Sequence, residues 1–293
     1  MQKNISETPE AESYFISGTA KYKSGDYKGA IEDYSAAIVL EPGIAELYNN
    51  RGNARNDMGD YAGAIEDYNK AIELDPTRAS AYYNRGNTKI YSGSADEAVE
   101  DYNMAIEIDK DYADFYNMRG IAKDDTGDYK GAVEDFDTAI KLNPEHAKAF
   151  VNRGITKINA GDYKGAIEDF DRAIDLNPDN AKAYTIRGIA KNKAGKKKDA
   201  IEDCAKAIEL DRQFAPAYCM RGIVRSSIGD FSGALKDFDM AIELDQKNAE
   251  AYYNRGNVRY NLRDTKGAEE DLSIAGKLGF KKALEDIKKI KNK

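Results

Sequence analysis

The chain has 293 residues, of which 41% are hydrophobic and 33% charged, and its formal net charge is −8. No stretch approaches the roughly 18 uninterrupted apolar residues that a membrane-spanning helix needs. The first residues, MQKNISETPE, lack the apolar segment of a secretory signal, so we expect a soluble, cytoplasmic protein without membrane contact. Two cysteines are too few for a disulfide scaffold, and the acidic balance disfavours generic binding to polyanions.

One ten-residue motif returns along the chain at multiples of 34 residues. It reads GDYKGAIEDY from Gly25, and close copies begin at Gly59, Gly127 and Gly161. A fixed period of this length is typical of a repeat array, in which each unit packs mainly against its neighbours. The length of the chain therefore reflects the number of repeats and does not imply separate globular domains.

Eight units of 34 residues fill residues 11–282 without insertion, and slot n denotes the nth residue of a unit. Apolar residues at three- and four-residue spacing predict one helix over slots 1 to 14 and a second over slots 17 to 30. Glycine at slot 15, in seven units, and aspartate at slot 16 are typical caps between two helices. Each unit is therefore predicted to be a helical hairpin, with residues 1–10 as an N-terminal tail and residues 283–293 as a polar capping helix.

Small and aromatic residues recur at fixed slots: an aromatic at slot 4, glycine at slot 8 and alanine at slots 20 and 27, as in Tyr48, Gly52, Ala64 and Ala71. These residues resemble the tetratricopeptide repeat over residues 11–282. The resemblance implies an all-α fold, a right-handed superhelical solenoid of eight antiparallel helix hairpins with a C-terminal capping helix. It also implies that the first helices line a concave groove and the second helices form the convex side.

The resemblance places slots 2, 5, 6, 9, 12 and 13 in the groove, and this chain is rich in asparagine there. An amide side chain carries donors and an acceptor, so it can pair with the N–H and C=O groups of an extended peptide of any sequence. Isoleucine and methionine replace asparagine in the middle units, which predicts a groove with polar ends and an apolar middle. The predicted peptide-binding residues are Asn49, Asn50, Asn53, Asn84, Asn87, Asn117, Asn152, Asn254, Asn257, Met118, Ile121, Ile155, Ile189 and Ile223. Recent duplication of the repeats is the alternative explanation, with the asparagines as solvated residues that bind nothing.

Arginine occupies slot 7 in seven units, where the family usually has leucine, and aspartate occupies slot 23 in every unit. A buried arginine without a partner would cost about 3–5 kcal/mol, so we expect each arginine to pair with the aspartate of its hairpin. The predicted structural ion pairs include Arg51 with Asp67, Arg85 with Asp101, Arg119 with Asp135, and Arg153 with Asp169.

Slot 11 is also basic, one helical turn from slot 7. The two basic rows, together with the lysine cluster from Lys191 to Lys198, leave an alternative function open, the recognition of nucleic acid or another acidic polymer. We disfavour nucleic acid, because slots 22 and 23 place acidic residues beside these rows in nearly every unit.

The sequence carries no catalytic signature, metal-ligand spacing or phosphate-binding loop. General acid–base and nucleophilic catalysis need an activated group beside an oriented partner. The one histidine, His146, lies in a short link where we expect it to be exposed, and Cys219 at slot 5 is expected to face the groove. We therefore expect no enzymatic activity and no cofactor, but a scaffold that binds a protein or peptide partner, with self-association as a further use.

Overall fold

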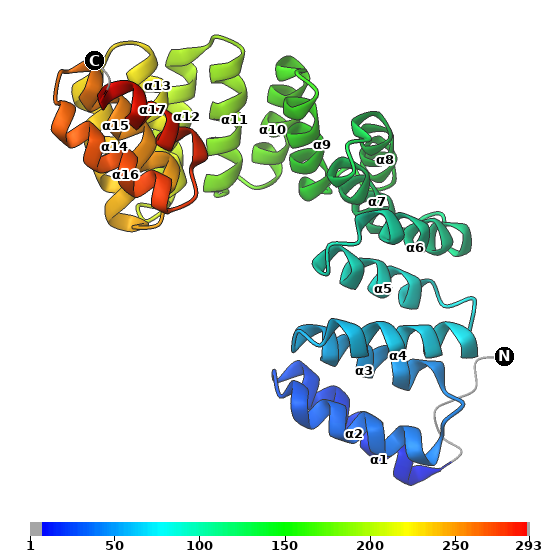
Figure 1. Ribbon diagram of the computed structural model, residues 1–293. Coiled ribbons are helices and arrows are strands. Elements are labelled where there is room, and N and C mark those ends of the chain that lie inside the picture. The colour runs from blue at the N-terminus through cyan, green and yellow to red at the C-terminus, as the bar shows by residue number, and fades with distance from the viewer. Residues whose placement is uncertain (1–7, 292–293) are drawn as a thin grey trace. The chain divides into compact units, whose positions relative to one another are not determined.

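The structure, a computed structural model, describes residues 8–291, with side chains as far as Lys288. Within these residues all regular structure is α-helical, and consecutive helices pair into antiparallel hairpins, as Figure 1 shows. This confirms the all-α hairpin array predicted from the repeat. None of the described helices is long and apolar enough to cross a membrane.

The chain forms two compact units, residues 1–149 and 150–293. The helices of the first unit are α1 (Pro9–Lys23), α2 (Tyr27–Leu40), α3 (Ala45–Asp57), α4 (Tyr61–Leu74), α5 (Ala79–Tyr91), α6 (Ala95–Ile108), α7 (Ala113–Asp125) and α8 (Tyr129–Leu142). Those that follow are α9 (Ala147–Asn159), α10 (Tyr163–Leu176), α11 (Ala181–Lys193), α12 (Lys197–Leu210), α13 (Ala215–Ser227), α14 (Phe231–Leu244), α15 (Ala249–Asn261), α16 (Thr265–Lys277) and α17 (Lys281–Lys291). The unit boundary falls inside α9.

A glycine and an aspartate set the turn inside most hairpins. In the first hairpin, Gly25 adopts a φ of 84°, which lets the chain leave α1 in the left-handed region. The Asp26 carboxylate then accepts the backbone N–H of Gly29 at 3.0 Å and caps the start of α2. In the last hairpin Arg263 takes the glycine slot with a φ of 66°, a conformation that costs a residue with a Cβ atom roughly 1–2 kcal/mol.

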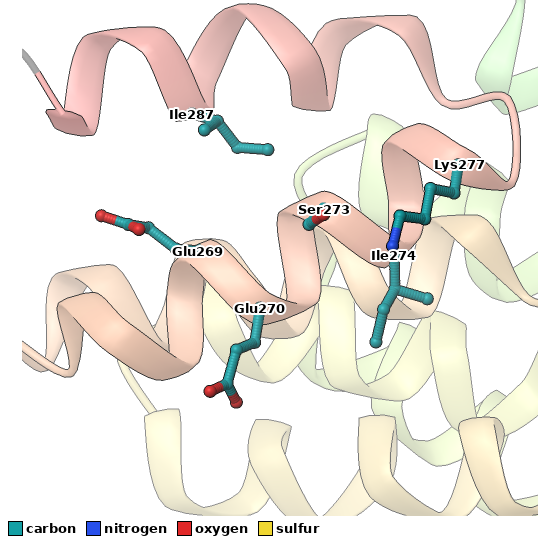
Figure 2. Close-up of a pocket in the computed structure, with 6 residues that line it drawn as sticks. All are labelled: Glu269, Glu270, Ser273, Ile274, Lys277 and Ile287. Carbon is teal, nitrogen blue, oxygen red and sulfur yellow. The ribbon is translucent and has the colours of Figure 1, made fainter.

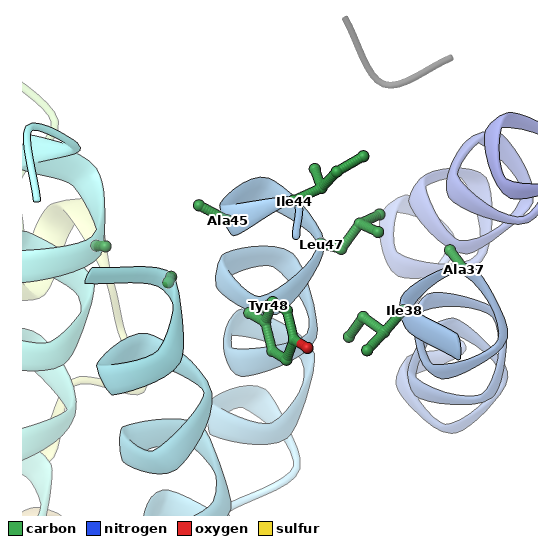
Figure 3. Packing of buried hydrophobic residues seen from close by; sticks show 8 residues of the cluster. Ala37, Ile38, Ile44, Ala45, Leu47 and Tyr48 are labelled. Atoms are coloured by element: carbon green, nitrogen blue, oxygen red, sulfur yellow. The ribbon is translucent and has the colours of Figure 1, made fainter. Parts of the chain in front are cut away.

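Apolar side chains fill the space between neighbouring hairpins. In Figure 3, Ile38 of α2 and Leu47 of α3 extend toward each other, with the ring of Tyr48 beside them. Ala71 and Ala81 continue the same cluster into α4 and α5. Each hairpin therefore completes its core with residues of the next one, as expected for stacked repeats.

The two ends of the array differ from the predicted boundaries. At the N-terminus, α1 begins at Pro9, inside the predicted tail, because proline suits the first turn of a helix. The rest of that tail, residues 1–7, lies outside the described residues. At the C-terminus, α17 begins at Lys281, and its Ala283, together with the preceding Phe280, packs against Tyr253 and Leu272. This helix covers the apolar face of the last hairpin and so caps the array.

Candidate functional site

The slot 7 arginines meet the slot 23 aspartates of their own hairpins. Arg51 donates through Nη2 to Asp67 Oδ1 at 2.7 Å and through Nε to Oδ2 at 3.0 Å, which makes a bidentate pair. The Arg51 guanidinium also lies over the Tyr48 ring, 5.6 Å from its centroid. The same pairing joins Arg85 with Asp101, Arg119 with Asp135, Arg153 with Asp169, Arg187 with Asp203, Arg221 with Asp237, and Arg255 with Asp271.

The slot 11 bases reach the same carboxylates. Lys89 Nζ lies 3.0 Å from Asp101 Oδ2, and Lys191 Nζ lies 2.8 Å from Asp203 Oδ2. Burial lowers the pKa of Arg187, but its hydrogen bonds and charge attraction to Asp203 outweigh this and leave the pKa above its ordinary value. The two basic rows therefore converge on one row of buried carboxylates and do not form an open basic surface.

Three asparagines on α3 and α5 form a hydrogen-bonded chain. Asn84 Nδ2 donates to Asn49 Oδ1 at 3.1 Å, and Asn49 Nδ2 donates to Asn50 Oδ1 at 3.3 Å. Asn49 is buried, with 6% exposure, whereas Asn50 and Asn84 are half-buried. Among the described residues, no group hydrogen-bonds to the Asn50 amide N–H groups or to the Asn84 amide oxygen. This series of hydrogen bonds thus ends in the amide donors of Asn50 on one side and the amide oxygen acceptor of Asn84 on the other.

Two further asparagines are oriented by tyrosines of the second helices. Tyr68 Oη donates to Asn53 Oδ1 at 2.8 Å, and Tyr102 Oη donates to Asn87 Oδ1 at 2.7 Å. Because each amide oxygen accepts a tyrosine proton, the amide nitrogens are left to act as donors. One N–H group of Asn87 hydrogen-bonds to the Tyr83 hydroxyl, so Asn87 keeps a single N–H group for a ligand.

These asparagines border a polar cavity of about 220 Å³ in the first unit. Its walls come from α1, α3, α4 and α5. The lining residues are Tyr22, Asn53, Asn56, Asp57, Tyr68, Asn84, Asn87 and Tyr91. Sequence reasoning selected Asn53, Asn84 and Asn87 but missed Tyr22, Asn56, Asp57, Tyr68 and Tyr91. Four of the missed residues occupy slots 12 and 13, which belong to the groove set that the resemblance implies but vary from repeat to repeat and form no row. The fifth, Tyr68, occupies slot 24, outside that groove set.

A larger cleft of about 570 Å³ lies between α16 and α17 (Figure 2). Glu269, Glu270, Ser273, Ile274, Lys277 and Ile287 line it. In Figure 2 the Glu269 and Glu270 side chains leave α16 in different directions, and Ile287 extends from α17 toward α16. The cleft contains none of the predicted groove residues and brings together no set of polar groups that a specific chemistry would need.

The remaining predicted residues divide between the two units. In the first, Asn117 is buried, Met118 packs against Ala98 and Tyr102, and Ile121 is half-buried. In the second, Ile155 packs beside Ile167 and Phe170. Ile189 and Ile223 pack beside Met220 and Val224. Of the asparagines, Asn152 and Asn257 are half-buried, and Asn254 Nδ2 donates to the Glu250 carbonyl at 2.9 Å. The second unit is therefore apolar along α9, α11 and α13 and polar at α15.

Two expectations about single residues are wrong. Cys219 does not face the groove: it is buried, and burial raises the pKa of its thiol to about 12. His146 is not exposed, since its side chain is 9% accessible and its Nε2 lies 3.0 Å from Asp114 Oδ1. Its Nδ1 accepts the Ala149 N–H at 3.3 Å, a donor that the His146 carbonyl also accepts at 3.0 Å, so His146 caps the start of α9. Among the described residues, no group of three His, Cys, Asp or Glu could hold a metal ion.

Comparisons with known proteins agree with the hairpin arrangement. A family described as "TPR repeat" matches residues 18–59, 52–90, 86–123 and 224–262, and families described as "Tetratricopeptide repeat" match residues 113–146, 147–180 and 181–214. No curated protein sequence matches this chain.

Solved structures share the fold. MamA from Desulfovibrio magneticus RS-1 is 26% identical, with 58% of this chain and 96% of that chain covered and a TM-score of 0.54. YrrB, described as a TPR protein with an unusual peptide-binding site, is 25% identical, covers 63% of this chain and 95% of its own, and has a TM-score of 0.53. A protein from Parabacteroides merdae ATCC 43184 is 21% identical, with coverage of 86% and 99% and a TM-score of 0.68. The chain therefore belongs to the tetratricopeptide repeat family.

Proposed function

We propose that this protein is a non-catalytic scaffold that binds an extended segment of a partner protein on the groove-facing side of its first helices. Proteins of this family generally mediate protein–protein interactions, and YrrB is described as having a peptide-binding site. The observation that carries the proposal is the asparagine chain of α3 and α5, with amide donors on Asn50 and an amide oxygen acceptor on Asn84.

This arrangement suits the backbone of an extended peptide. Such a backbone carries one N–H donor and one C=O acceptor at almost every residue, spaced at about 3.3 Å per residue. Asn50, Asn53 and Asn87 can donate to carbonyl groups, and Asn84 can accept from an N–H group. Each bond contributes about 1 kcal/mol, so backbone recognition alone is weak and independent of peptide sequence. Selectivity must then come from side-chain pockets next to the asparagines.

The second unit supports a complementary kind of contact. Ile186 and Ile189 of α11 and Ile223 of α13 are half-buried apolar side chains at groove slots. An apolar face of this kind accepts apolar side chains of a peptide or a helix. In our proposal, the second unit binds apolar residues of a partner protein.

Recognition of nucleic acid has less support. The slot 7 and slot 11 bases are paired with buried aspartates, as in the contacts of Arg187 and Lys191 with Asp203. Within the Lys191–Lys198 cluster, Lys197 Nζ donates to the Ser227 carbonyl at 3.1 Å. A basic surface that tracks phosphates needs unpaired cations in a row, and these contacts remove most of the candidates.

The test begins with selecting unstructured 12-residue peptides from a display library against the intact chain. Their dissociation constants are then measured by fluorescence anisotropy for the native chain, Asn50→Ala and Asn84→Ala, with Lys130→Ala as control. Lys130 lies on α8, and its side chain is 91% exposed. Each asparagine substitution should weaken every peptide by about five- to tenfold, the loss of about one hydrogen bond, and the control should change nothing. Unaltered affinity in both asparagine variants, with native helicity, would contradict the proposal.

A further inference from the structure

The polar cavity of the first unit contains one charged lining residue, Asp57, at the C-terminal end of α3. A carboxylate is unfavourable at this end of a helix, because the helix dipole is negative there. Asp57 Oδ2 accepts from Tyr22 Oη at 2.6 Å, and Oδ1 accepts from Asn56 Nδ2 at 3.3 Å. No described lysine or arginine forms an ion pair with it. The Asp57 carboxyl group thus has no cationic partner among the described residues and keeps spare lone pairs on both oxygens.

Three tyrosines line the same cavity, and Tyr22 and Tyr91 are the two that lie beyond the asparagine-orienting Tyr68. Tyr91 stacks on Tyr61 of α4 with ring centroids 6.2 Å apart and an interplanar angle of 16°, yet it remains 67% exposed. Tyr22 packs against Tyr27 and donates to Asp57. Burial and the neighbouring Asp57 carboxylate raise the pKa of the Tyr22 hydroxyl above its ordinary value, so Tyr22 remains a neutral donor. Accessible aromatic faces beside a carboxylate attract cations.

We propose that this cavity binds a cationic side chain of the partner peptide, an arginine in preference to a lysine. The inference rests on the proposed function, because this side chain belongs to the segment that the neighbouring asparagines hold. A guanidinium has a planar fork of donors that fits the two Asp57 oxygens. The guanidinium plane can lie against the Tyr91 ring.

The chain already uses this chemistry within its own hairpins. Arg51 pairs in a bidentate manner with Asp67 while its guanidinium covers the Tyr48 ring. The cavity presents the same two partners, a carboxylate and an accessible tyrosine ring, but holds no arginine of its own among its lining residues. The missing cation is therefore expected from the partner, which also agrees with the net charge of −8 on this chain.

The probes for this test are N-acetyl-arginine amide and its neutral isostere N-acetyl-citrulline amide. Binding to the intact, nitrogen-15-labelled chain is followed through the side-chain amide signals of Asn53 and Asn87 by NMR. We expect saturable shifts with the arginine probe and at least tenfold weaker binding of the citrulline probe. Asp57→Asn should abolish this difference. Asp125→Asn is the matched control, because Asp125 occupies the same slot of the fourth 34-residue repeat and lies outside the cavity. This variant should preserve the preference for the arginine probe.

Two results would overturn the inference: equal binding of both probes, or an arginine preference that survives Asp57→Asn. Either failure is distinguishable from failure of the proposed function. If the library-selected peptides still depend on Asn50 and Asn84, only the cationic pocket is lost from the account. If they bind equally well without these asparagines, backbone recognition fails whatever the cavity binds.

Discussion

Arginine at slot 7 contacts two helices of its hairpin. Arg119 pairs with buried Asp135 on α8, and its guanidinium lies 5.6 Å from the Tyr116 ring centroid on its own helix. A buried ion pair adds little stability relative to a well-packed apolar pair, but its loss on one side leaves an uncompensated charge. The pairs therefore make the hairpin sensitive to single substitutions at these two slots.

Replacement of Arg119 by leucine, the usual residue of the family at slot 7, should destabilise the array. Asp135 would keep only Lys123, whose Nζ lies 2.8 Å from Oδ2. We expect the free energy of unfolding to fall by about 2–3 kcal/mol, less than for complete loss of a buried partner because this lysine remains. Urea unfolding followed by circular dichroism measures the change.

The double variant Arg119→Leu/Asp135→Asn should recover part of this loss, since it removes the buried anion, although Lys123 loses its carboxylate partner. Lys130→Ala, on the same hairpin, should stay within about 0.5 kcal/mol of the native chain. The pairing would have no structural role if Arg119→Leu behaved like this control.

Residues that recur at a fixed slot could be predicted from the sequence, whereas residues that occur once could not. Arg51 and Asp67 each repeat through the array, so their pairing followed from the hairpin geometry. His146 occurs once, and its burial depends on Asp114, which lies 32 residues earlier in the same 34-residue repeat. The link position alone therefore gave no sign that this side chain caps α9.

At the scale of the hairpin, the slot 8 glycine makes room for the slot 24 aromatic ring. A Cβ atom on Gly222 would lie 2.7 Å from Phe238 Cε1, too close for any real contact. In the sixth hairpin Cys204 replaces the aromatic residue, and a Cβ atom on Gly188 would lie 3.2 Å from its Sγ atom. The slot 8 glycine therefore faces an aromatic ring in the seventh hairpin and a cysteine in the sixth, so the two hairpins can be compared directly.

Gly222→Ala should destabilise the protein more than Gly188→Ala. Alanine is better than glycine in a helix interior by about 1 kcal/mol, but overpacking against Phe238 costs about 1–3 kcal/mol. We expect a net loss of up to about 2 kcal/mol for Gly222→Ala and little change for Gly188→Ala. Urea unfolding of both variants tests this comparison. Equal losses would show that the ring is not the cause.

The repeat predicted most helix boundaries because the capping residues repeat with it. The second helices begin at slot 17 and end at slot 30, as α4 does at Tyr61 and Leu74. The first helices end one residue before the predicted slot 14, where Met58 forms the C-cap of α3. The last unit departs from the pattern, because Gly279, with a φ of 96°, allows α17 to start early.

At the scale of the whole molecule, each unit has its own groove-facing residues on the first helices. Their composition followed from the slots: asparagine prevails at α3, α5 and α15, and isoleucine or methionine at slots 6 and 9 of α7, α11 and α13. The directions of the amides did not, because Tyr68 and Tyr102 of the second helices set them. The cationic pocket was also beyond sequence reasoning, since Tyr22, Asp57 and Tyr91 come from three hairpins.

The central claim is that the asparagines hold the backbone of an extended peptide. Its most direct test is a backbone N-methylation scan of one library-selected peptide, with dissociation constants measured by fluorescence anisotropy beside an alanine scan of the same peptide. Removal of a single N–H that pairs with Asn84 should weaken binding by about fivefold or more, and this loss should disappear in Asn84→Ala. Most alanine substitutions should change affinity by less than this. If N-methylation were harmless at every position and side-chain substitutions accounted for the affinity, backbone recognition would be contradicted.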